Sequence, residues 1–461
     1  MDKSKILNLK RLLTEQKTMP ELFQSIPASV SEWASTTLLA VLTAWLFISA
    51  FWWNDGDWAA QSGVYTRLML GIGYLGLLTG AFWLIWEHYN EPKPWRERSK
   101  GNGLVLCLGA MLVWSCISCA LSNNVEVSFF GDFYRIDGLM SYLAYAGIFI
   151  LATRVRSKKA VKVILNTISA VAAITALTVL LNIPQVNNIL GIERIRAFFQ
   201  NQNHYGYFLC MALPTTIWLY IDANTHKKGL YIVEAGLISN SLIICKTLGT
   251  LLAAVLGLVL LIVFVSIRCP KERKSASLII TVIAAVLVVS SLGYWNVFGD
   301  VDRTVADVKT INENVLGTAD TEQQANLDSV GSGRGIVWRN TLQLIKEKPL
   351  FGYGPDNLGA ALMDHGCKLD RPHCEPMQFA AMLGIPGALF YIAGMIFLLA
   401  AFIRNFKRLT AWEICGYVVV GTYLMSSMVG NTMYYTTPTF FTLLGLCHSQ
   451  IRELELKACG S

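Results

Sequence analysis

The twenty-residue stretch that decides the class of fold is Leu248-Gly-Thr-Leu-Leu-Ala-Ala-Val-Leu-Gly-Leu-Val-Leu-Leu-Ile-Val-Phe-Val-Ser-Ile267, which has no charged side chain. As a helix it would be about 30 Å long, which matches the hydrocarbon core of a bilayer. A helix is expected because only a helix satisfies all backbone polar groups within one lipid-exposed segment. The basic residues that follow predict that its carboxyl end is cytoplasmic. They are Arg268, Lys271, Arg273 and Lys274.

Apolar runs of similar length recur from one end of the 461-residue chain to the other. Only 15% of the residues are charged, whereas about a quarter are charged in a typical soluble domain. The sequence therefore predicts an all-α, polytopic integral membrane protein of about twelve transmembrane helices with one large helical extracytoplasmic loop. The expected spans are 34–53, 67–86, 103–121, 138–153, 162–181, 204–221, 229–245, 248–267, 276–296, 386–403, 412–429 and 436–450.

Every second short loop is rich in lysine and arginine, which gives the orientation. The positive-inside rule makes these loops cytoplasmic, and an even number of spans then puts both termini in the cytoplasm. The start of the chain has no apolar core with a cleavage site, so we expect the first span to direct insertion. The basic residues are Lys3, Lys5, Lys10, Arg11, Lys17, Lys93, Arg96, Arg98, Lys100, Arg154, Arg156, Lys158, Lys159, Lys227, Lys228, Arg268, Lys271, Arg273, Lys274, Arg404, Lys407 and Arg408.

One loop stands out because it is the only long polar stretch between expected spans. Loops of such length are usually functional or disordered. The topology then divides the chain into a cytoplasmic amino-terminal segment (1–33), nine spans (34–296), a large extracytoplasmic catalytic loop (297–385), three spans (386–450) and a cytoplasmic tail (451–461).

The large loop is expected to have two parts. Residues 300–330 are acidic and polar without strong periodicity, whereas 332–385 carries the signals of folded helices. Ser332 can N-cap a helix over 334–348, and Asp356 or Asn357 can N-cap a second helix that reaches about residue 365.

His373 stands just before a third expected helix, which has Pro376 in its first turn and ends near Gly384. A helix amino terminus favours anions and disfavours the imidazolium ion. A histidine there tends to stay neutral, as a general base must be. From the residues alone, a solvated loop histidine without a catalytic role is the alternative.

Five short motifs lie on the expected outer side of the membrane. They read Gly131-Asp-Phe-Tyr-Arg135-Ile-Asp137-Gly138, Phe199-Gln-Asn201-Gln-Asn203-His204-Tyr-Gly206, Gly333-Arg334-Gly-Ile-Val-Trp338, Pro349-Leu-Phe-Gly352-Tyr-Gly354-Pro355, and His373-Cys374 followed after nine residues by Gly384-Ile-Pro-Gly387. In their order and placement, these motifs resemble those of the O-antigen ligase and O-antigen polymerase superfamily.

The resemblance implies a glycosyltransferase at the outer face of a bacterial cytoplasmic (inner) membrane, active in assembling cell-surface polysaccharide. The donor would be a glycan linked to undecaprenyl pyrophosphate, and the acceptor a glycan, lipid or polymer; ligase and polymerase roles both fit. No cofactor and no metal are expected. The candidate residues are His373 and Arg334 for catalysis; Arg334, Arg196, Lys246 and Arg135 for the donor pyrophosphate; Asn201, Asn203 and His204 for substrate; and Gly352, Gly354, Gly384 and Gly387 for structure.

The sequence departs from the family pattern at two positions. Cys374 follows the histidine, where Asn, Ser or Gln is usual. Leu248 stands where many members carry an arginine, and Lys246 could supply that charge without the planar fork of a guanidinium.

Several residues also fit structural interpretations. Arg135 could pair with Asp132 or Asp137, and the asparagines could cap the sixth span. Arg196 could anchor lipid head groups, with Arg194 taking the functional place. Tyr434 and Tyr435 fit an interfacial aromatic belt. Cys367 and Cys374 could pair, and Asp300 with Asp302 is the remaining candidate for a metal site.

Other classes of function fit the sequence less well than the transferase. Nothing indicates nucleic-acid binding, since no basic stripe interleaved with exposed aromatics occurs. A transporter or flippase would show repeated halves and buried charges near the membrane midplane. Such charges are few here apart from Glu234, and no repeat is evident. A non-catalytic assembly partner is the third possibility.

Overall fold

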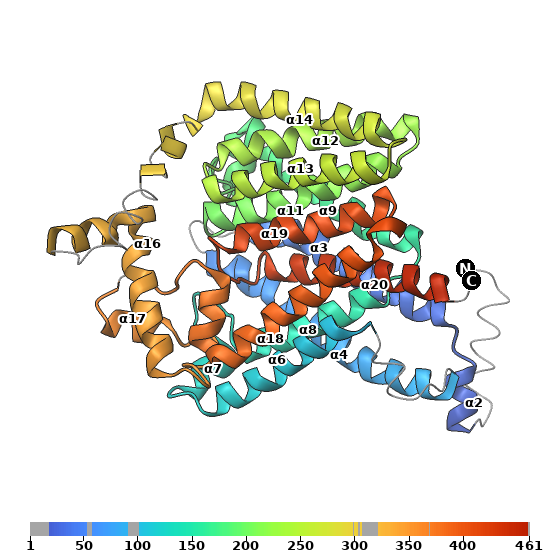
Figure 1. Cartoon of the computed structure of the whole chain (residues 1–461), viewed down its shortest axis with the longest axis horizontal. Helices are drawn as coiled ribbons and strands as arrows, with labels where there is room; N and C mark the ends of the chain where they lie inside the picture. Colours follow the sequence, from blue (N-terminus) through green and yellow to red (C-terminus); the bar gives the residue numbers. More distant parts are fainter. Residues whose placement is uncertain are drawn as a thin grey trace.

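The computed structural model describes residues 18–52, 58–90, 101–297, 299–302, 305–306, 321–367 and 369–459 (Figure 1). These residues form helices and no strand, which confirms the predicted all-α class. The helices are α2 (Met19–Gln24), α3 (Ala28–Ile48), η1 (Ser49–Trp52), α4 (Trp58–Asn90), α6 (Gly103–Ala120), α7 (Val125–Phe130), α8 (Leu139–Thr153), α9 (Lys158–Leu181), α10 (Pro184–Leu190), α11 (Gln202–Asp222), α12 (Thr225–Ile244), α13 (Leu248–Arg268), α14 (Arg273–Tyr294), α16 (Thr321–Glu347), α17 (Gly359–Asp364), α18 (Glu375–Asn405), η2 (Phe406–Arg408), α19 (Ala411–Ser427) and α20 (Thr437–Cys459).

Each expected span coincides with one helix of the described chain. Within the described residues, seven candidate spans are long and apolar enough to cross a membrane on their own: α3 with η1, α4, α6, α9, α13, α14, and α18 with η2. The other five helices, α8, α11, α12, α19 and α20, are shorter or more polar along their length. The chain is therefore a polytopic membrane protein, and a total of twelve crossings stays a prediction.

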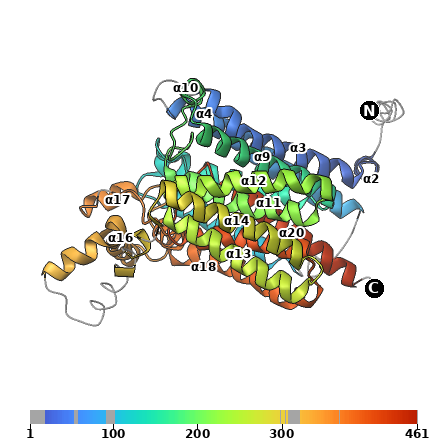
Figure 2. The same ribbon diagram turned by 90° about the horizontal axis from the view of Figure 1, so that it is seen from above.

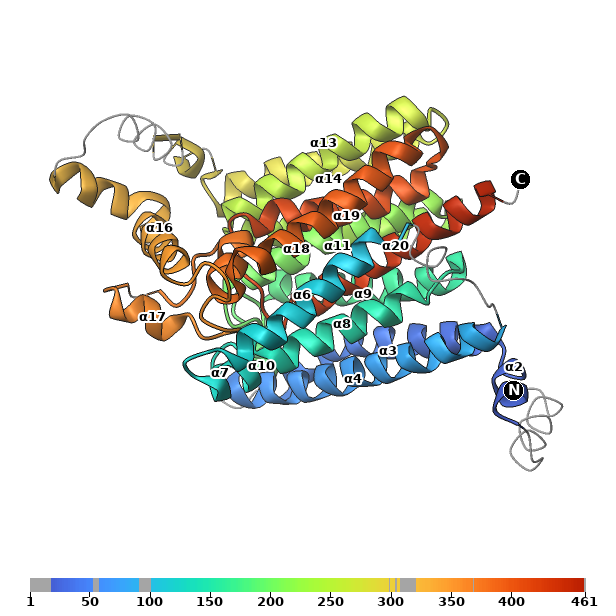
Figure 3. The same ribbon diagram turned by 60° about the horizontal axis from the view of Figure 1, so that its bottom comes forward.

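The long helices lie side by side in one bundle (Figures 1 and 2). Helices α16 and α17 project from one end of it, which we call the loop end. Helix α2 and the carboxyl-terminal part of α20 lie at the opposite end (Figure 3). The two ends of the described chain thus share one side of the bundle, as an even number of crossings requires.

Close packing of small residues fixes α8 in the bundle. A side chain at Gly76 of α4 would collide with the backbone of Gly147, and one at Gly73 with the backbone of Ala144. Small residues at such interfaces let two membrane helices approach until their backbones touch. Because α8 is held in this way, the loop 131–138 at its amino-terminal end is held at the loop end of the bundle.

The projecting helices differ from expectation in two places. Helix α16 begins at Thr321, well before the predicted N-cap at Ser332, so part of the segment expected to be irregular is helical. Good helix formers in Thr321-Glu-Gln-Gln-Ala outweigh the capping tendency of a serine inside the run. Helix α17 begins after Leu358 and not at Asp356 or Asn357, because the Asp356 carboxylate is used elsewhere.

Candidate functional site

Helix α16 brings Arg334 to the segment that carries His373. Trp338 Nε1 donates a 2.7 Å hydrogen bond to the carbonyl oxygen of Pro372, the residue before His373. Arg334 lies one helical turn before Trp338, so both side chains belong to the same face of α16. Arg334 is close enough to His373 to lower its pKa electrostatically. The structure therefore brings together the two residues predicted to be catalytic.

His373 is held as a neutral imidazole. Burial, then the positive charges of Arg334 and Arg135, lower its pKa to about 4. Its backbone has φ 48°, a left-handed conformation that is costly for a residue with a side chain. Its Nδ1 is buried without a hydrogen-bond partner in the described part of the chain. A neutral ring with an unused nitrogen, held on this strained backbone, is suited to accept a proton.

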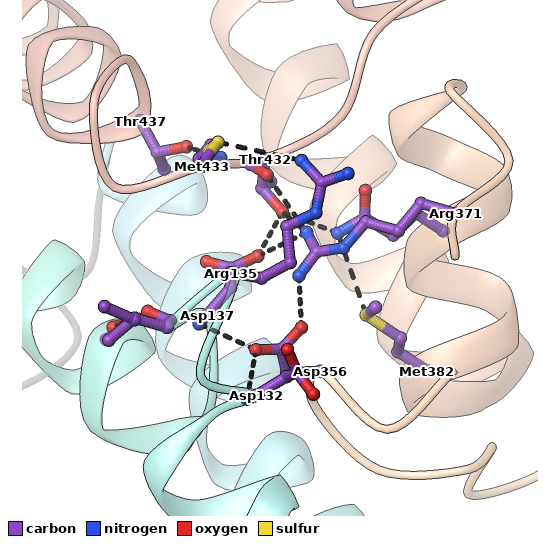
Figure 4. Close-up of polar contacts among 12 residues, drawn as sticks. Asp132, Arg135, Asp137, Asp356, Arg371, Met382, Thr432, Met433 and Thr437 are labelled. Atoms are coloured by element: carbon purple, nitrogen blue, oxygen red, sulfur yellow. Dashed lines mark hydrogen bonds and ion pairs between the residues drawn. The ribbon is translucent and has the colours of Figure 1, made fainter. Parts of the chain in front are cut away.

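The conformation before His373 is fixed by the buried guanidinium of Arg371, which is 1% exposed (Figure 4). Arg371 Nη1 donates to Asp137 Oδ2 at 3.0 Å and to the carbonyl oxygen of Thr432 at 3.0 Å. Arg371 Nη2 is ion-paired with Asp356. Asp356 Oδ2 in turn accepts from the backbone N–H groups of Asp132 at 2.7 Å and Asp137 at 2.9 Å. Three segments distant in sequence thus meet at one arginine, with the carboxylates satisfying its charge.

Arg135 forms the second ion pair of the site, with Asp370. Its Nε and Nη2 donate to the two oxygens of that carboxylate at 2.7 and 2.9 Å, a bidentate geometry. Although burial opposes ionisation, these bonds hold the pKa of Asp370 at about 2. The alternative pairing of Arg135 with Asp132 or Asp137 is wrong, because Arg135 binds Asp370, and Arg371 and Asp356 bind that loop instead.

A strip of donors on α6 holds the turn 349–355. Trp114 Nε1 donates to the carbonyl oxygen of Leu350 at 3.2 Å, Ser118 Oγ to that of Phe351 at 2.6 Å, and Ser122 Oγ to that of Tyr353 at 2.8 Å. Trp114 and Ser118 are four residues apart on α6, and Ser122 follows after another four just past its end, so they form one face. The turn is therefore anchored to the bundle at three of its carbonyls.

The glycines of the last two motifs pack against each other. Gly384 has φ 76° and interrupts α18, so that its first part ends where the predicted third helix was expected to end. A side chain on Gly384 would collide with the Leu350 carbonyl, and one on Gly352 with the Met382 carbonyl. Gly354 N donates to the Met382 carbonyl at 2.8 Å. Gly387 lies against Leu383 and Trp114. Close backbone contact between turn and helix thus requires these glycines.

The Asn201 segment contributes a cap and a buried histidine. Asn201 N-caps α11 by accepting from Asn203 N at 2.8 Å. His204 is 2% exposed, and its Nδ1 is buried without a partner among the described residues. His204 is within electrostatic range of both Arg135 and His373. His204 therefore lies near the centre of the site, whereas Asn201 caps a helix.

Arg196 and Lys246, two of the residues predicted to bind the donor pyrophosphate, contact other parts of the chain than the residues around His373. Arg196 is ion-paired with Glu193 and donates to the Phe199 and Gln200 carbonyls at 3.4 and 3.3 Å. Lys246 is exposed and borders a hollow formed with residues 291–297. A role for either residue in donor binding stays a prediction.

Two further sequence interpretations concern a pair of tyrosines and a pair of cysteines. Tyr434 and Tyr435 are fully buried and pack against Tyr65, so the interfacial belt expected of them is wrong. Aromatic side chains beside a polar loop suit a core as well as an interface. Cys367 and Cys374 are buried free cysteines, so the structure does not contain the disulfide considered for them.

Sequence reasoning missed Asp356, Asp370, Arg371 and Thr432. The first three lie within a loop already singled out, in Pro355-Asp356 and in Asp370-Arg371-Pro-His373. Charged residues beside motif residues were the available signal. Their partners were not readable from the sequence, since each bond joins segments far apart in the chain.

Comparison with known proteins bears on the same segment. Residues 236–392 match the protein-family model described as O-antigen ligase. The match supports the superfamily resemblance and covers Lys246, Arg334, His373 and the glycine motifs, whereas Arg135, Arg196 and His204 precede it. Among curated proteins, none matches the chain.

Proposed function

We propose that this O-antigen ligase-like membrane protein transfers a glycan from a polyprenyl pyrophosphate carrier to an acceptor hydroxyl, at the extracytoplasmic face of a bacterial cytoplasmic membrane. The observation that carries the proposal is the neutral His373 ring beside the guanidinium groups of Arg334 and Arg135. A base and a pair of cations are the two elements that such a transfer needs.

In the proposed reaction, the acceptor oxygen attacks the anomeric carbon while His373 takes the hydroxyl proton. The bond between that carbon and the pyrophosphate oxygen breaks, and the electron pair leaves with the lipid pyrophosphate. Negative charge on the leaving group increases as this bond breaks. We assign that charge to Arg334, which can hold it through a bidentate contact. Arg135 is already bound to Asp370 and contributes its field from the side.

The lowered pKa of His373 matters for this role. An imidazolium could not accept a proton, and the same cations that bind an anion would expel a proton from the ring. With a pKa of about 4, His373 is neutral at physiological pH. Loss of a positioned base typically slows a reaction by about 10² to 10⁴.

The test separates the base from the anion clamp. In lipid nanodiscs, His373→Ala should slow single-turnover transfer by about 10² to 10⁴ and leave donor affinity nearly unchanged. Arg334→Ala should weaken donor binding as well as slow the reaction. Arg334→Lys should recover only part, because the fork is lost.

Matched controls come from the same loop. His365→Ala and Arg339→Ala remove another histidine and another α16 arginine that lie outside the proposed machinery, and both should keep activity. Full activity of His373→Ala would reject the proposed base. Loss of donor binding in His373→Ala, with Arg334→Ala unaffected, would instead exchange the two roles.

A further inference from the structure

An elongated apolar cavity of about 150 Å³ lies inside the membrane-spanning bundle. Helix α6 forms one wall of it, and aromatic side chains of α8 and α20 form the opposite wall, among them Tyr145, Phe149 and Phe441. We call it the α6–α8 slot. It exists because α6 packs mainly on α18, whereas α8 packs mainly on α4 and α20.

One end of the slot reaches the candidate site. Tyr142, Phe379 and Thr432 line that end, and the carbonyl oxygen of Thr432 accepts the 3.0 Å hydrogen bond from Arg371. Met433, the next residue, contacts Arg135 Nη1 through its sulfur at 3.7 Å. A chain that enters the slot from this end therefore begins beside the guanidinium groups of the site.

The other end of the slot lies deep in the bundle, at Val105 and Ile150. Ser115 lines it near the loop end, so it runs about 15 Å along α6 at 1.5 Å per residue. Its flank is open at Gly109, which is exposed and has no atom within 4 Å of the position of an added Cβ. A lipid chain can therefore enter sideways from the bilayer.

We propose that the α6–α8 slot binds the isoprene units of the donor lipid that lie nearest to its pyrophosphate. This inference rests on the proposed function, because it takes the donor to be a polyprenyl pyrophosphate. The slot is narrow, because its volume of about 150 Å³ is spread over a length of about 15 Å along α6. Its length therefore suits the first few isoprene units. Flat aromatic walls match flat, methyl-branched isoprene units better than a flexible straight chain.

The position of the slot selects the donor chain over other lipids. A donor whose pyrophosphate is bound by Arg334 next to Arg135 places its first isoprene carbons at the Thr432 end. Binding of the chain in the slot would then fix the position of the lipid carrier, so that the anomeric carbon lies within reach of His373. Recognition of the chain thereby becomes part of positioning the reaction.

The experiment compares two pyrophosphates with the same number of carbons in the chain. Farnesyl pyrophosphate is branched and unsaturated, and pentadecyl pyrophosphate is straight and saturated, so hydrophobicity alone does not favour the farnesyl chain. We expect the wild-type protein in nanodiscs to bind farnesyl pyrophosphate about tenfold more tightly, which corresponds to about 1.4 kcal/mol. Gly109→Leu fills the slot and should abolish this preference. Ala146→Leu fills it from the opposite wall and should do the same.

The matched control is Gly71→Leu, because Gly71 of α4 is also exposed with open space around it but does not line the slot. It should leave the preference intact. Equal binding of both pyrophosphates by the wild type, or a preference that survives both slot-filling variants, would overturn the slot while leaving the transferase proposal standing. Competition by phospholipid at the slot without any chain preference would assign it to acyl chains. Failure to bind any lipid pyrophosphate would reject both proposals together.

Discussion

Arg371 Nη1 lies 3.0 Å from Asp137 Oδ2, although the two residues are 234 positions apart in the sequence (Figure 4). Arg371 stands two residues before His373, and Asp137 stands two residues before the start of α8. The pair therefore fixes the segment that bears the proposed base to a helix of the bundle. The site is held in place by this contact and not by the loop alone.

Removal of Arg371 is predicted to destabilise the fold. Arg371→Met leaves Asp137 and Asp356 buried without their cation, and breaking a buried pair in this way costs about 3–5 kcal/mol. Thermal unfolding in detergent should show a clearly lower midpoint. The control is Arg404→Met, since Arg404 is 61% exposed and its pair with Glu455 should contribute under about 1 kcal/mol. An unchanged midpoint for Arg371→Met would contradict the role given to this cluster.

The loss of activity at acid pH should reflect protonation of His373. Its pKa is depressed to about 4, so the base is neutral and active above that pH and is lost by protonation as the pH falls through it. After burial, the positive charge of Arg334 is the largest cause of the lowered pKa of His373. Arg334→Gln should therefore raise the pKa of His373 and move the acid limb of the single-turnover rate to higher pH. If the acid limb stays at the same pH in Arg334→Gln, Arg334 must lie farther from the His373 ring in the reacting complex.

Gly384 should not accept a side chain. Gly384→Ala forces a residue with a Cβ into φ 76° and against the Leu350 carbonyl, and the left-handed conformation alone costs about 1–2 kcal/mol. We expect a lower unfolding midpoint together with lower activity, because α18 and the turn at 349–355 would separate. Gly421→Ala is the control, since nothing lies within 4 Å of a Cβ there. Equal stability of the two variants would show that the interruption of α18 tolerates a side chain at position 384.

The orientation of the chain is testable by labelling. Cysteines introduced at Ser329 and Asn314 should react with an impermeant thiol reagent in whole cells or spheroplasts, whereas cysteines at Lys158 and Lys228 should react only after lysis. The unmodified protein provides the background from its own thiols. Labelling of the Lys158 and Lys228 positions in intact cells would reverse the topology and move the proposed site to the cytoplasm.

Transfer is predicted to persist in excess chelator, because arginines are expected to replace a metal at the pyrophosphate. The measurement is product formation before and after chelation, with magnesium or manganese added back. A requirement for added divalent ion would contradict this expectation and return attention to Asp300 and Asp302. In the structure Asp300 accepts a 2.6 Å hydrogen bond from Trp295 Nε1.

Contiguous stretches of sequence determined the class of fold and several points of the site. The run 248–267 is α13, because an apolar segment in a bilayer must satisfy its own backbone. The break at Gly384 and the helix start beside Pro376 were also predictable, since both depend on the backbone preferences of one or two residues. Each of these features is decided by hydrogen bonding and solvation within a short segment.

Tertiary structure alone decided which charged groups meet. The sequence shows Arg135, Asp356 and Arg371 but does not indicate that Arg135 binds Asp370 and that Arg371 joins Asp137 to Asp356. For the same reason it misplaced Tyr434 and Tyr435, whose rings are buried against a distant helix. A charge or a ring has similar local preferences at a surface and in a core. Its partner depends on how helices far apart in the chain pack, which no short segment encodes.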